Sequence, residues 1–113
     1  MFLKISAGGD LQFEDRHNFR AFKLVVEGDR TALDAARQAL AGRVELPDAE
    51  TAWIFENALR RWPGIEHDAA WQQSFSAMIE KARPHGWIDD QRQAIKAHVE
   101  WITAQEAASA KPG

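Results

Sequence analysis

The chain has 113 residues, of which 45% are hydrophobic and 27% charged, and it carries a formal net charge of −3. This composition is typical of a globular protein, so we expect one domain over residues 1–110 and a frayed tail over residues 111–113. The acidic balance argues against non-specific nucleic-acid binding, and the apolar runs are too short for a membrane span. The lack of cysteine excludes a disulfide framework and a thiolate metal site.

The first segment has the pattern of a β-hairpin. Apolar residues alternate loosely with polar ones over residues 2–7 and again over residues 11–14. Between them, Gly8, Gly9 and Asp10 supply turn residues, because glycine tolerates the positive φ that tight hairpin turns require. A phosphate-binding loop is not indicated, since no Lys-Ser/Thr pair follows the glycines.

Residues 19–26 fit two structures. As a strand, the segment would be apolar on both faces, which is typical of a central position in a sheet. As a helix starting at Asp15, it would gather Phe19, Phe22 and Val26 on one face. The bulky, β-branched end of the segment favours the strand, and Gly28 follows it as a stop.

A short alanine-rich helix is predicted over residues 31–41, followed by Gly42 as its C-terminal stop. Residues 43–46 alternate and predict a short strand. Residues 19–46 would then form a strand-helix-strand unit, in which a right-handed crossover makes the two strands parallel neighbours.

Helical spacing of apolar residues predicts three longer helices in the C-terminal half, over residues 48–62, 68–82 and 90–104. The connections between them are short, so we expect antiparallel neighbours. The predicted fold class is therefore α+β. A small N-terminal sheet of two to four strands would pack against a C-terminal layer of three longer helices plus one short helix.

One loop, at residues 83–90, concentrates groups that could bind a ligand. It places a guanidinium, an imidazole, an indole and carboxylates beside a predicted helix N-terminus, where amides and the helix dipole favour an anion. The candidate ligand-binding residues are Arg83, His85, Trp87 and Asp89. We favour a simpler interpretation, in which the loop only connects two helices, the indole plugs the core and an aspartate caps the last helix.

No reactive constellation is apparent in the sequence. The four histidines, at positions 17, 67, 85 and 98, lack the i, i+4 spacing of a zinc-binding helix, and the carboxylates follow no pattern. We therefore expect no metal and no cofactor, and we assign no catalytic residue.

The tryptophans favour an interaction surface. Trp53 and Trp101 lie beside the apolar stripes of their predicted helices, and tryptophan is enriched at protein interfaces. No targeting segment precedes the first strand, so our leading hypothesis is a small cytoplasmic, non-catalytic protein. It would act as a homodimer or through another protein partner, without nucleic acid or membrane. The alternative is a small-molecule binding protein or enzyme with an anion pocket near residues 83–90.

Overall fold

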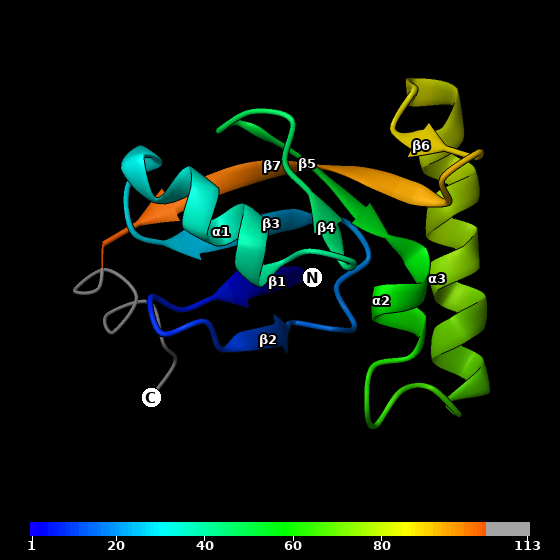
Figure 1. The fold of residues 1–113 in the computed structure, drawn as a ribbon. Helices are drawn as coiled ribbons and strands as arrows, with labels where there is room; N and C mark the ends of the chain where they lie inside the picture. Colours follow the sequence, from blue (N-terminus) through cyan, green and yellow to red (C-terminus); the bar gives the residue numbers. More distant parts are fainter. Residues whose placement is uncertain (104–113) are drawn as a thin grey trace.

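The computed structural model describes residues 1–103, and the predicted tail at residues 111–113 lies outside them (Figure 1). Within these residues the main element is a seven-stranded mixed sheet of order β2-β1-β3-β7-β5-β4, with β6 also paired to β7. The strands are β1 (Phe2–Ile5), β2 (Leu11–Glu14), β3 (Lys23–Glu27), β4 (Val44–Glu45), β5 (Thr51–Phe55), β6 (Ile88–Asp89) and β7 (Ala94–Ile102). The helices are α1 (Leu33–Ala39), α2 (Glu56–Arg60) and α3 (Ala69–Ala82), with single 3₁₀ turns η1 (Arg30–Ala32) and η2 (Arg83–His85).

The predicted fold class is wrong, because the sheet and not a helical layer is the main element. Residues 90–104 contain β7, a nine-residue strand that pairs with both β3 and β5. Its residues 95–99 alternate between buried and exposed, as expected for a strand. Ile95, Val99 and Ile102 are also spaced i, i+4, i+7, so the same residues fit a helical stripe. The hydrogen bonding of β7 to β3 on one edge and to β5 on the other selects the strand over the helix.

The helix predicted over residues 48–62 is also wrong. Its first part is β5, in which Ala52 and Ile54 are buried beside half-buried neighbours. The helix begins only at Glu56 and covers five residues as α2. The chain leaves the sheet there because β5 pairs with β7 no further than Phe55, opposite Ala94.

The predicted crossover between residues 19–26 and residues 43–46 does not occur. β4 pairs with β5 in antiparallel orientation, whereas β3 lies between β1 and β7 and is parallel to both. The true neighbour of β3 thus comes from the far end of the described chain, which a local pattern cannot reveal.

Five predicted elements are confirmed, and one of them is the short strand within residues 43–46, which is β4. The hairpin of β1 and β2 pairs in antiparallel register, and β3 is central with Leu24, Val25 and Val26 all buried. α1 follows the turn that Asp29 caps. α3 begins after Asp68, whose side chain accepts a hydrogen bond from the amide of Trp71.

The core lies on one face of the sheet. The register places Leu3, Leu24 and Val99 side by side, and all three are buried. α1 and α3 add buried side chains to the same cluster, including Ala36 and Phe75. In Figure 1, α1 lies against the sheet and α3 stands beyond the point where β5 enters α2. No helix among residues 1–103 is long and apolar enough to cross a membrane.

Candidate functional site

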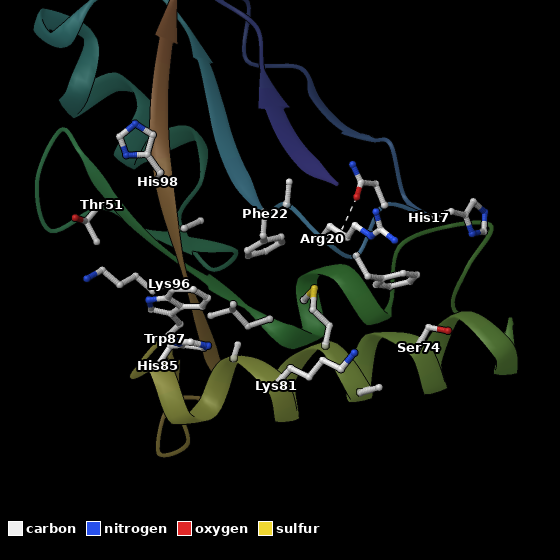
Figure 2. A pocket seen from close by; sticks show the side chains of 18 of the residues that line it. His17, Arg20, Phe22, Thr51, Ser74, Lys81, His85, Trp87, Lys96 and His98 are labelled. Carbon is white, nitrogen blue, oxygen red and sulfur yellow. Dashed lines mark hydrogen bonds between the residues drawn. The ribbon is translucent and has the colours of Figure 1, made fainter.

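A groove of about 1060 Å³ lies beside the middle of β7, at a point where its two partner strands on one edge, β3 and β6, are separated. On the edge of β7 away from β5, β3 pairs with residues 98–102 and β6 pairs with residues 94–95. Lys96 and Ala97 lie between these two partners and line the groove. Figure 2 shows β7 running down to α3, with the residues around position 20 on the far side of the opening.

The first wall is the connection between β2 and β3, of which residues 17–22 line the groove. The amino group of Met1 donates hydrogen bonds to the carbonyl oxygens of Asn18 at 2.7 Å and of Ala21 at 2.8 Å. Burial lowers the pKa of this amino group. Phe19 and Phe22 pack against the core. This irregular segment is therefore held both by hydrogen bonds to its backbone carbonyl groups and by the packing of its two phenylalanine side chains.

The second wall is one side of α3. One stripe of α3 residues is buried against the core. A second stripe, which lies next to the first on the helix surface, lines the groove. The buried stripe consists of Trp71, Phe75, Ile79 and Ala82. The groove stripe consists of Ser74, Ala77, Met78 and Lys81, spaced i, i+3, i+4 and i+7. Both stripes are on a helix whose position is fixed by Trp71, because its indole Nε1–H donates to the carbonyl oxygen of Arg16 at 2.8 Å.

Trp87 stands at the end of the groove next to β7. Gly86 precedes it with a φ of +78°, a left-handed conformation that favours glycine and ends the turn η2. The indole stacks on the imidazole of His85, with ring centroids 4.4 Å apart and planes inclined by 19°. The backbone N–H of Lys96 donates to the carbonyl oxygen of Trp87 at 2.7 Å. Both rings line the groove.

The groove is cationic although the protein is acidic. Arg20, Lys81 and Lys96 line it, and none of their side chains forms an ion pair within residues 1–103. The carboxylate on the lining is that of Glu50, which pairs with Arg30 at 3.2 Å. The three cations therefore meet solvent in the groove, where an anionic ligand would find partners.

Two of the four predicted ligand-binding residues, His85 and Trp87, line the groove, and two do not. The guanidinium of Arg83 binds Glu80 at 2.8 Å and also binds Asp90. These hydrogen bonds raise the pKa of Arg83 and lower that of Glu80. Arg83 is thus already paired with carboxylates of the protein.

Asp89 is the last residue of β6, directly before the turn that leads to β7, and the helix N-terminus predicted beside it is absent from this described segment. Its carboxylate accepts from the amides of Gln91 at 3.1 Å and of Arg92 at 3.2 Å, and from Nε of Arg92 at 2.6 Å. These hydrogen bonds lower the pKa of Asp89, and the bond from the Arg92 side chain has the largest effect. Asp89 organises the turn and is not aimed at the groove.

Trp53 and Trp101, the predicted interface residues, lie on opposite faces of the sheet. Trp53 is opposite Lys96, and the guanidinium of Arg92 lies 5.4 Å from the centre of its ring. Trp101 is opposite Val26 on the core face, and its Nε1–H donates to the carbonyl oxygen of Ala49 at 2.7 Å. Both are half-buried. The structure therefore does not bring them to one surface.

Sequence reasoning missed the cations of the groove. Lys81 could have been found from the second stripe of α3, which is polar at both ends and apolar in the middle. Lys96 could have been found from the exposed positions of β7, once that segment is taken as a strand. Arg20 carries no local signal, because its position depends on the path of an irregular connection.

The lining carries two kinds of nitrogen-containing side chain that could contact a ligand. Arg20, Lys81 and Lys96 supply positive charge, and His17, His85 and His98 supply imidazoles. No group of three or more histidine, aspartate or glutamate side chains that could hold a metal ion occurs in the part of the chain that the structure describes.

The chain matches no protein-family model, and neither a curated protein nor a solved structure is detectably similar to it.

Proposed function

We propose that the groove binds a small organic anion with an apolar body, and that the protein acts through this binding. The observation that carries the proposal is the set of three cations, Arg20, Lys81 and Lys96, that line one groove and form no ion pair among residues 1–103. A ligand carboxylate, sulfonate or phosphate would form charge-assisted hydrogen bonds with them. Because the protein is acidic overall, the attraction would be local to the groove.

The apolar body is indicated by the surfaces between the cations. Phe22, Met78 and Ile95 line the groove, and the first two pack against the core while remaining half-buried. Hydrocarbon placed there would leave water without the cost of losing hydrogen bonds. The volume of about 1060 Å³ is at the upper end of the range of small-molecule sites.

Binding without catalysis is favoured by the arrangement of the reactive side chains. Ser74 and Thr51 are the hydroxyl residues of the lining, and the imidazoles of His17, His85 and His98 are the candidate bases. None of these hydroxyls forms a hydrogen bond with one of these imidazoles in the described chain. A nucleophile activated by a base, the usual mark of covalent catalysis, is therefore not indicated.

Isothermal titration calorimetry with decahydro-2-naphthoate and its neutral primary amide tests the proposal. We expect the acid to bind and the amide to bind at least tenfold more weakly. The variant Lys81→Gln should lose about fivefold in affinity for the acid, since it removes one partly exposed charged contact. Arg43→Gln is the matched control, because this exposed cation is outside the groove lining. Equal binding of acid and amide, or equal losses in the two variants, would refute the proposal.

Association through Trp53 and Trp101 stays a prediction. Their placement on opposite faces supports it less than a single exposed patch would, because a symmetric dimer uses one self-complementary surface. A cytoplasmic location also stays a prediction.

A further inference from the structure

Trp87 is the exposed large hydrophobic side chain of the described residues, with 47% of its surface accessible. The other four tryptophans have partners within the protein. Trp62 and Trp71 contact Phe13 edge-on, Trp53 lies under Arg92, and Trp101 donates its Nε1–H to a backbone carbonyl. Trp87 differs from them by its exposure at the end of the cationic groove.

The indole of Trp87 is held in place although it is exposed. One face stacks on the imidazole of His85, and its backbone is bound to Lys96 of β7. No second ring of residues 1–103 lies against it. No ring of these residues occupies the opposite face of the indole, and 47% of the Trp87 surface stays accessible to a ligand. Aromatic rings in such offset-stacked arrangements attract each other beyond the effect of burial alone.

We infer that the groove selects planar aromatic acids, with the ring of the ligand stacked on Trp87 and its acidic group bound by the neighbouring cations. This inference rests on the proposed function and names its ligand class. Figure 2 shows the Lys96 side chain beside the indole, whereas the Lys81 side chain extends along α3 away from Trp87. An acid attached directly to the ring, or through a short spacer, would meet the ammonium group of Lys96 while its ring remains on the indole.

The lining favours a hydrocarbon ring over a nucleotide. A nucleotide also joins a planar ring to an anionic group, but a ribose with its hydroxyl groups lies between them. In this groove the lining beyond Trp87 includes the apolar side chains of Phe22 and Met78. Hydroxyl groups placed against these side chains would lose hydrogen bonds to water. A fused or substituted aromatic acid has no such groups to desolvate.

A matched pair of ligands tests the inference. 2-Naphthoate and decahydro-2-naphthoate have the same carbon skeleton and the same charge, and only the first is planar and aromatic. We expect the wild-type protein to bind 2-naphthoate roughly three- to tenfold more tightly than the saturated acid, as measured by calorimetry. Trp87→Leu should abolish this preference, so that the variant binds the two acids with equal affinity. Trp87→Phe should retain part of the preference.

The outcomes separate this inference from the proposed function. If the wild-type protein binds the two acids equally, or Trp87→Leu keeps the preference, the aromatic selection is refuted while anion binding stands. If neither acid binds, the proposed function fails and this inference fails with it. Trp87 is exposed and contributes no buried core contact, so Trp87→Leu should fold, which an unchanged circular dichroism spectrum would verify.

Discussion

Lys96 donates its backbone N–H to the carbonyl oxygen of Trp87 at 2.7 Å, and this bond joins β7 to the turn that follows α3. It fixes a cation of the strand next to an exposed ring. The two residues also mark the place where β3 and β6, both paired to the same edge of β7, leave an opening. The position of the groove thus follows from the pairing of the sheet.

Gly86→Ala should destabilise the protein by about 1 kcal/mol, because alanine is strained in the left-handed conformation. Gly86 has a φ of +78° and open space where a Cβ would be, so strain and not a clash causes the loss. Urea unfolding measures the free energy. Gly8→Ala is the control, since its Cβ would lie 3.9 Å from Ser6 and its φ is not in this region. Equal effects of the two substitutions would contradict the explanation.

Trp71→Phe should lower the free energy of unfolding by about 2 kcal/mol, through a small cavity and the loss of a buried hydrogen bond. Trp71 is 2% exposed and stacks on Phe75 at 4.8 Å. Its Nε1–H also holds the carbonyl oxygen of Arg16. The exposed Trp87 provides the comparison, and Trp87→Phe should change the free energy by less than about 0.5 kcal/mol. A larger loss of unfolding free energy for Trp87→Phe than for Trp71→Phe would contradict the description of Trp71 as the buried ring and Trp87 as the exposed one.

Stability should fall on acidification, and Asp48 should account for part of the loss. Its carboxylate accepts from the amides of Glu50 and Thr51, both at 2.8 Å, where β5 begins. These bonds lower the pKa of Asp48 below its ordinary value of 3.8. A carboxylate with a lowered pKa in the folded state stabilises the fold at pH values above its unfolded-state pKa. This contribution is lost as the pH falls through the lowered pKa of the folded state.

Asp48→Asn should therefore flatten the dependence of the urea midpoint on pH below about 4. At neutral pH the variant should be less stable than the wild type, because asparagine accepts the two bonds without a charge. A variant with the same acid slope as the wild type would show that Asp48 does not contribute in this range.

The confirmed elements are those that local pattern determines. The hairpin has its glycine turn, β3 is a short apolar run followed by Gly28, and α3 combines the Asp68 cap with a long apolar stripe. β7 was mistaken because its apolar residues satisfy two periods at once. What decides the structure of residues 94–102 is pairing with β3 and β5, both distant in the sequence.

The candidate site was predictable only at one end. The loop at residues 83–90 drew attention by its composition, and His85 and Trp87 do line the groove. The charge of Arg83 suggests a ligand contact in the sequence, but two carboxylates of the protein already bind its guanidinium. Arg20 joins the groove through a connection that Met1 holds by hydrogen bonds to Asn18 and Ala21. Such contacts depend on the finished fold.

The most direct test of anion binding in the groove is a nuclear magnetic resonance titration of the ¹⁵N-labelled protein with 2-naphthoate. We predict saturable shifts confined to residues 17–22, 74–87 and 95–98, together with the indole Nε1–H signal of Trp87. The indole signal of Trp101, on the core face of the sheet, should stay in place. Shifts scattered well beyond these residues, or none at ligand concentrations in the millimolar range, would contradict the assignment of this groove as the binding site.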